Sequence, residues 1–229
     1  MLGFADALVT LVDTLIMRGV IPILHTNRAR LDSPSADRWV ETYNTVIRGL
    51  AQGRQVPLFD QFALLEGLTD FGLGADGLHM SVYKSGGISQ ACRFHEEALD
   101  YGTNTRNLAT LEALARLTAV LTDGLEAPDT APAALQGLGT LGSPFVIDAL
   151  PFSAMRDTTE SPQSALDQYS GCAADQDESG PEHLYRLTLE APTRLRAMVL
   201  DQGQVDIDLH LLNDTATVAG CMARHDRLW

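Results

Sequence analysis

Residues 72–82, GLGADGLHMSV, place an aspartate three positions before a histidine in a glycine-rich stretch typical of neither a helix nor a strand. A histidine that takes a proton from a hydroxyl nucleophile needs an anion on its other ring nitrogen, which fixes the tautomer and steadies the imidazolium. Asp76 and His79 have the types and spacing for this pairing in a tight loop. We predict an acid–base pair here; the alternative is a solvated or structural loop histidine.

The flanking sequence predicts the elements that hold this loop. Apolar residues at helical spacing predict helices within 1–18, 37–53 and 104–122, each followed or ended by a glycine, namely Gly19, Gly53 and Gly124. Two short apolar runs, 20–24 and 56–60, predict buried strands, each with a proline near its start.

Strands that alternate with amphipathic helices indicate a parallel sheet with helices on its faces, and functional groups gather on loops beyond the strand C-termini. The loop with Asp76 and His79 follows the second strand. Two strands are few for such a sheet, so we expect the α/β fold to continue upstream of this chain.

Beyond the first segment, 1–123, the composition changes. Residues 124–144 are rich in proline, glycine and alanine and predict a linker. In 145–229 the apolar period becomes two, and the short runs predict an antiparallel β-sandwich, incomplete at its end, with strands at 185–189, 193–200, 205–211 and 216–222.

The state of the three cysteines bears on the location of the protein. Cys172 and Cys221 both fall in the β-rich segment and either form a disulfide or remain two buried thiols, whereas Cys92 lies in the first segment without a partner there. A disulfide would place the protein outside the cytosol, at the cell surface or beyond it.

Charge narrows the possible partners. With a net charge of −14 and no basic cluster, the chain repels phosphate backbones, which argues against nucleic acid and anionic membranes. The apolar N-terminus contains Asp6 and Asp13 and lacks an early positive charge, so it fits neither a signal peptide nor a membrane span. No zinc-ligand spacing or phosphate-binding glycine motif is present, and we expect no cofactor.

The strand VPLFD, the glycine-rich loop, DGLH and the helix after it resemble the last conserved block of the SGNH or GDSL hydrolases, and GVIPILHTN and the YN pair at Tyr43 and Asn44 agree with the second half of that fold. The resemblance implies a partial flavodoxin-like three-layer domain. It also implies esterase, lipase or carbohydrate deacetylase activity on an ester substrate, with Asp76 as orienting acid and His79 as general base.

The sequence departs from that family where the nucleophile should be. No G-D-S serine motif occurs, and no G-x-N-D motif precedes the first strand, while the serines near the pair, Ser33, Ser35, Ser81, Ser85 and Ser89, are poor substitutes. Met80 stands where the family often has proline. We therefore expect a fragment of a secreted bacterial hydrolase that is inactive by itself.

The second segment resembles the bacterial pre-peptidase C-terminal β-sandwich that is appended to secreted hydrolases, on the strands YRLTL and DIDLHLL. Asp206 and Asp208 there could bind Ca²⁺ or form the solvated face of a strand. Arg28 and Arg30, after the first strand, are either at the rim of the active site or exposed loop charges. The alternative to a hydrolase is a non-catalytic extracellular protein that binds a carbohydrate or protein surface through the β-module.

Overall fold

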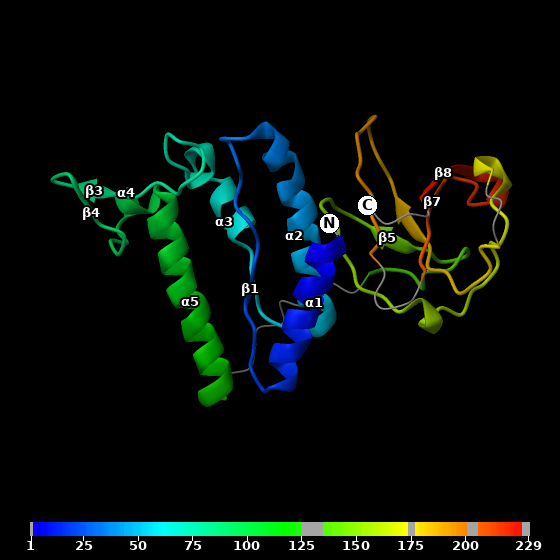
Figure 1. The fold of residues 1–229 in the computed structure, drawn as a ribbon, viewed down its shortest axis with the longest axis horizontal. Helices are drawn as coiled ribbons and strands as arrows, with labels where there is room; N and C mark the ends of the chain where they lie inside the picture. Colours follow the sequence, from blue (N-terminus) through cyan, green and yellow to red (C-terminus); the bar gives the residue numbers. More distant parts are fainter. Residues whose placement is uncertain (1, 125–134, 174–176, 201–205, 226–229) are drawn as a thin grey trace. The chain divides into compact units, whose positions relative to one another are not determined.

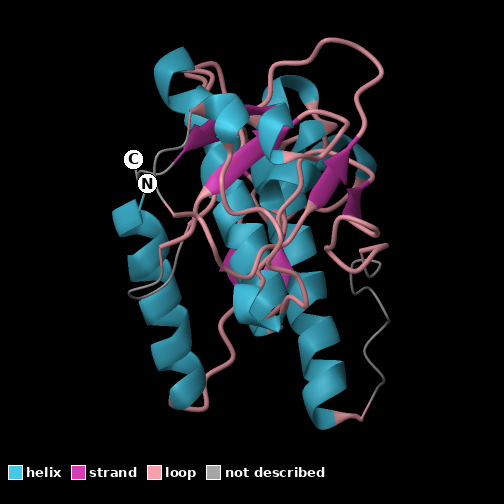
Figure 2. Ribbon diagram, turned by 90° about the vertical axis from the view of Figure 1, so that its right-hand side faces the viewer, coloured by secondary structure: helices cyan, strands magenta, loops and turns pink. Residues whose placement is uncertain are grey.

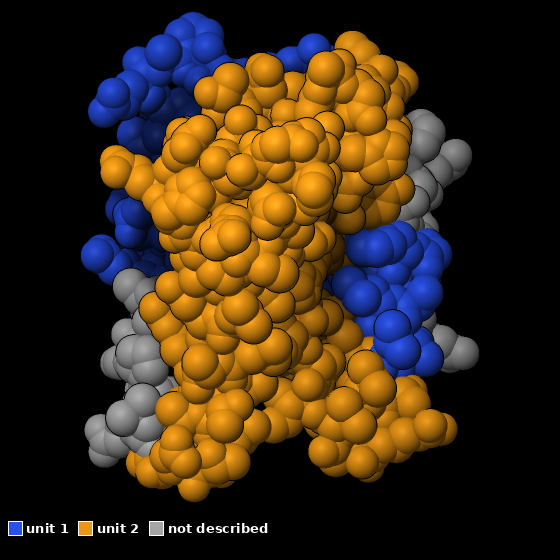
Figure 3. Space-filling model, turned by 90° about the vertical axis from the view of Figure 1, so that its left-hand side faces the viewer, with its two compact units in different colours: residues 1–11, 132–152, 156–229 blue, residues 12–131, 153–155 orange. Residues whose placement is uncertain are grey.

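The computed structural model describes residues 2–124, 135–173, 177–200 and 206–225 (Figure 1). The chain divides into two compact units: unit 1 comprises residues 1–11, 132–152 and 156–229, and unit 2 comprises residues 12–131 and 153–155 (Figure 3). The division at 131/132 falls inside the range predicted as a linker. Part of that range, 125–134, lies outside the described residues.

Unit 2 has the predicted order of helices and strands. Helix α1, Leu2–Met17, begins in unit 1 and enters unit 2, and is followed by β1, Leu24–His25, α2, Pro34–Arg54, and β2, Leu58–Phe59. The short helix α3, Gln61–Glu66, and the 3₁₀ turn η1, Thr69–Gly72, lead into the loop with Asp76. The hairpin strands β3, Lys84–Ser85, and β4, Ile88–Ser89, and helix α4, Glu96–Leu99, precede α5, Gly102–Thr122.

The β1–β2 pair of unit 2 is parallel, as predicted, whereas the β3–β4 hairpin is antiparallel. Leu24 pairs with Leu58 and His25 with Phe59, and Figure 1 shows α2 and α5 on opposite sides of this pair. Each strand spans two residues and begins after the proline of its predicted run, because Pro22 and Pro57 lack the backbone N–H that pairing needs. Strand β2 lies within the predicted range 56–60, whereas β1 extends one residue beyond 20–24. The segment is thus mixed α/β, and its flavodoxin-like arrangement stays a prediction.

Two of the three predicted helix ends are confirmed. Gly19 and Gly124 follow α1 and α5 with φ of 76° and 65°, the left-handed conformation that glycine adopts at no cost. Gly53 was predicted to end α2 but lies inside it, and Gln55 takes the left-handed position instead. The side chain of Met155 occupies the space that a Cβ on Gly53 would need, so this glycine serves packing.

The antiparallel β-sandwich predicted for 145–229 is wrong as an arrangement. Strand β5, Phe145–Ile147, pairs in parallel with β6, Tyr185–Leu187, and only β7, Leu209–Leu212, and β8, Cys221–His225, are antiparallel. These pairs form separate two-stranded sheets, and the strands are short beside the long helices (Figure 2).

The strand predicted at 193–200 is absent. These residues are largely exposed and have no assigned secondary structure or strand partner among the described residues, and an apolar pattern alone does not make a strand when no neighbour supplies hydrogen bonds. The strand predicted at 205–211 begins four residues later, at Leu209. Residues 135–144, which were predicted as linker, fold onto β5 and β6, where Gly139 accepts a hydrogen bond from the backbone of Leu184.

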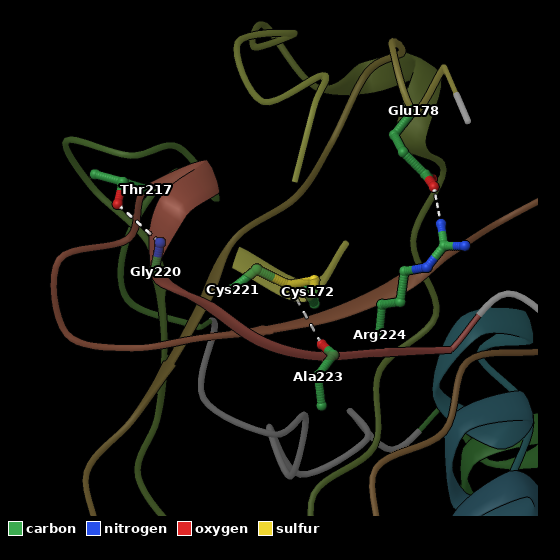
Figure 4. Close-up of a disulfide and its surroundings, with 7 residues drawn as sticks. All are labelled: Cys172, Glu178, Thr217, Gly220, Cys221, Ala223 and Arg224. Atoms are coloured by element: carbon green, nitrogen blue, oxygen red, sulfur yellow. Dashed lines mark hydrogen bonds and ion pairs between the residues drawn. A yellow bond between two sulfur atoms is a disulfide. The ribbon is translucent and has the colours of Figure 1, made fainter. Parts of the chain in front are cut away.

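A disulfide joins Cys172 to Cys221, which confirms the predicted pair, and Cys92 is free and exposed (Figure 4). Cys221 is buried with Leu166 and Tyr169 in the small core of unit 1. Beside the disulfide, Arg224 pairs with Glu178 at 2.6 Å (Figure 4). The bridge and the ion pair connect β8 to loops far away in sequence.

Breaking this bridge should destabilise unit 1 selectively. It spans 49 residues, and in the chain-entropy picture closing such a loop contributes about 4 kcal/mol. The double variant Cys172→Ala, Cys221→Ala should lower the free energy of unfolding of unit 1 by that order, measured by amide hydrogen exchange, with unit 2 unchanged. Cys92→Ser is the control and should alter neither unit; equal loss in both variants would contradict the assignment.

Candidate functional site

The loop that carries Asp76 and His79 is a closed turn with its own backbone bonds. Gly74 donates from its backbone N–H to the carbonyl oxygen of His79 at 2.7 Å, and Leu73 and Met80 form an antiparallel bridge. Gly77 has φ of 64°, and a Cβ there would lie 2.8 Å from the backbone nitrogen of Asp32. Glycine is therefore required where this turn meets the loop after β1.

The structure brings Asp76 and His79 together. His79 Nδ1 lies 2.7 Å from Asp76 Oδ2, and Asp76 Oδ1 accepts the backbone N–H groups of Leu78 and His79 at 3.0 and 2.9 Å. One carboxylate thus holds both the histidine ring and the backbone that carries it. Both side chains are exposed, His79 to 76% and Asp76 to 52%.

The hydrogen bond from His79, with those from the backbone of Leu78 and His79, lowers the pKa of Asp76 to about 2. The carboxyl is therefore ionised at neutral pH and only accepts hydrogen bonds. His79 Nδ1 must then carry the proton of the shared bond, which leaves Nε2 of the neutral ring with a free lone pair. That atom is the one that can take a proton from a hydroxyl group.

The loop between β1 and α2 supports the turn from outside. Arg28 Nε donates to the carbonyl oxygen of Leu78 at 2.8 Å, and the backbone N–H of Asp32 donates to the carbonyl oxygen of Gly77 at 3.1 Å. Arg28 is half-buried, so the reading of an exposed loop charge does not hold for it, whereas Arg30 pairs with Asp32. These contacts fix the residue immediately before His79.

Two buried asparagines hold the surrounding loops. Asn44 on α2 accepts the backbone N–H of Asn27 and donates to the carbonyl oxygen of the same residue. Asn104 on α5 accepts from Tyr83 and donates to the carbonyl oxygens of Gln90 and Arg93. Both amides are fully buried. A polar residue within an apolar helix face is the sequence signal that could have identified Asn104.

The serines near the pair have structural roles. Ser81 Oγ donates to the carbonyl oxygen of Gly72 and accepts the backbone N–H of Gly102, so it ties the start of α5 to the loop. The hydroxyls of Ser33 and Ser35 contact each other at 3.1 Å. Ser85 and Ser89 lie in the β3–β4 hairpin. Among the described residues, none of these serines has a hydrogen bond to the His79 ring.

A groove of about 420 Å³ opens beside the loop and is lined by Gly74, Met80, Ser81, Val82, Lys84 and Tyr101. Gly74 and Met80 belong to the turn that carries the pair, although neither Asp76 nor His79 lines the groove. Sequence reasoning missed it, because four of the lining residues lie within 72–82 but Lys84 and Tyr101, which complete the groove, come from β3 and from the residue before α5.

Among the described residues, no group of three or more His, Cys, Asp or Glu side chains is placed to hold a metal ion, and this includes Asp206 and Asp208. In the same parts of the chain, no helix has the length and apolar character needed to cross a membrane. Searches of protein-family models, curated proteins and solved structures found no match to this chain.

The pKa of Asp76 should depend on His79. Because the pKa of Asp76 is lower in the folded loop than its unfolded value near 4, the ionised carboxyl stabilises the fold at pH values above about 4. That contribution is lost as the pH falls through about 2. In His79→Ala the strongest hydrogen bond is lost while the two backbone bonds remain. The midpoint, followed by ¹³C NMR of the side-chain carboxyl, should rise from about 2 toward the usual aspartate value; an unchanged midpoint would contradict the pairing.

Removing the Arg28 guanidinium should loosen the loop. We expect Arg28→Leu to raise the amide exchange rates of Gly77, Leu78 and His79 by about tenfold, since a charged hydrogen bond contributes on the order of 1.5 kcal/mol. Arg30→Leu removes the same charge two residues away and is the matched control. Similar acceleration in both variants would mean that the Arg28 to Leu78 bond does not hold the turn.

Proposed function

We propose that Asp76 and His79 are the orienting acid and the general base of a serine ester hydrolase of the SGNH type. The observation that carries the proposal is the 2.7 Å contact between His79 Nδ1 and an ionised carboxylate, which leaves Nε2 on an exposed ring. The serine and the oxyanion donors are supplied by further sequence or by a partner chain, because the described serines near the loop are bonded elsewhere or lie on the hairpin.

In the proposed reaction His79 Nε2 takes the proton of the serine hydroxyl as its oxygen attacks the ester carbonyl carbon. Asp76 stabilises the imidazolium through the Nδ1–H bond. The imidazolium then returns the proton to the leaving alkoxide, and an alcohol departs from the acyl-enzyme. Water, deprotonated by the same Nε2, releases the carboxylic acid and restores the serine.

The substrate class under this proposal is an ester of a small molecule or carbohydrate, and the location is extracellular or at a bacterial cell surface. The disulfide between Cys172 and Cys221 supports an oxidising location, since such bridges persist mainly outside the cytosol. Unit 1 would then act as the appended module of a secreted hydrolase.

The test compares hydrolysis of p-nitrophenyl acetate by residues 1–229 and by the same chain joined to in-frame upstream sequence that contains a Gly-Asp-Ser segment. We expect turnover only in the joined form, reduced by about 10⁴-fold in His79→Ala and Asp76→Asn, because the base or its orientation is lost.

His95→Ala, which removes another exposed histidine of unit 2, is the control and should retain activity. Turnover that survives His79→Ala would overturn the assigned base. An upstream reading frame without a nucleophile, together with no turnover, would favour the non-catalytic binding protein instead.

A further inference from the structure

The groove beside His79 has the size of a small-molecule site. Its volume of about 420 Å³ lies within the range of ligand pockets in proteins, roughly 300 to 1,000 Å³. Met80, Val82 and Tyr101 give it apolar walls, and Gly74 and Met80 belong to the turn that holds Asp76 and His79. A molecule in this groove would contact Met80, the residue directly after the proposed general base, although the His79 ring itself does not line the groove.

A positively charged side chain lines the groove. Lys84, on β3, is the only lysine in the sequence, whose net charge is −14. Within the described parts of the chain, Lys84 forms neither an ion pair nor a side-chain hydrogen bond. Its ammonium group is thus available to a ligand in the groove.

Three carboxylates around the loop already have cationic or proton-donating partners. Asp76 is bonded to His79, Asp32 to Arg30, and Asp60 to Arg48. These acids are engaged with partners other than Lys84. Arg28 adds another cation to the same loop, through its bond to Leu78.

From this arrangement we infer that the groove accepts an ester that carries a carboxylate, with Lys84 pairing with that anionic group. The apolar walls would contact the methylenes between the carboxylate and the ester, and the ester would reach toward His79. The inference rests on the proposed function and narrows its substrate class to monoesters of dicarboxylic acids and related anionic esters.

The test uses a matched pair of probes, monoethyl adipate and its neutral amide, ethyl 6-amino-6-oxohexanoate. Because Lys84 is the only lysine, reductive methylation places ¹³C-methyl groups on its side chain and on the N-terminal amine alone. We expect monoethyl adipate to shift the Lys84 signal and to bind about fivefold more tightly than the amide at low salt, with the difference falling as salt is raised.

Lys84→Met should remove the preference and leave the affinity for the amide unchanged, and Lys84→Arg should restore it. Arg116→Met removes an exposed positive charge on α5 and should keep the preference. Circular dichroism confirms that each variant is folded. A preference that survives Lys84→Met, or a Lys84 signal that monoethyl adipate does not move, overturns the inference.

These results separate the two proposals. Binding through Lys84 without any hydrolysis that depends on His79 would contradict the proposed hydrolase function, while the inference that the groove binds anions would stand. Hydrolysis that depends on His79 but does not change with Lys84 or with the charge of the ligand would contradict only the inference that the groove binds an anionic ester. In the active form, loss of Lys84 should raise KM for monoethyl adipate and leave kcat unchanged, as expected for a contact made equally in the ground and transition states.

Discussion

The candidate site depends on the hydrogen bonds that the carboxylate of Asp76 accepts. This carboxylate accepts three hydrogen bonds, from the His79 ring and from the backbone of Leu78 and His79, so the acid defines both the course of the chain and the orientation of the ring. An interaction between two exposed side chains alone would contribute little free energy in water, since screening and side-chain entropy oppose it. Here the backbone bonds organise the turn locally, and the ring bond needs little further ordering.

The turn is precise only because neighbouring segments hold it at both ends. Gly72, with φ of 65°, meets Gly102 at the start of α5, where a Cβ on Gly72 would lie 2.7 Å from Gly102 Cα. Ser81 bonds to both of these glycines. On the other side, Arg28 and Asp32 bind the carbonyl oxygens of Leu78 and Gly77. The loop thus obtains from tertiary contacts the rigidity that it lacks as secondary structure.

The sequence predicted the parts of this arrangement that depend on local pattern. Helical periodicity located α1, α2 and α5, and the D-x-x-H spacing identified a pair that can close one hydrogen-bonded turn. Local pattern could not reveal that Gly53 lies inside α2, because its reason is the side chain of Met155, about a hundred residues later. It also could not show that β5 pairs with β6 in parallel, since a period of two is the same in either direction.

The sequence predicted the positions of the helices better than the burial of their apolar side chains. On α5, Leu111, Leu114 and Leu121 are among the apolar residues at helical spacing that predict the helix at 104–122, yet they are 46–57% exposed, and Leu11 of α1 is 55% exposed. Periodicity reports which side chains can share a face, whereas burial requires another element on that face. Among the described residues these faces lack such cover. The exposed ring of His79 is a separate case, because it lies on a loop rather than on a helix face. Its exposure leaves Nε2 open to a hydroxyl group, which is what the proposed role as a general base requires.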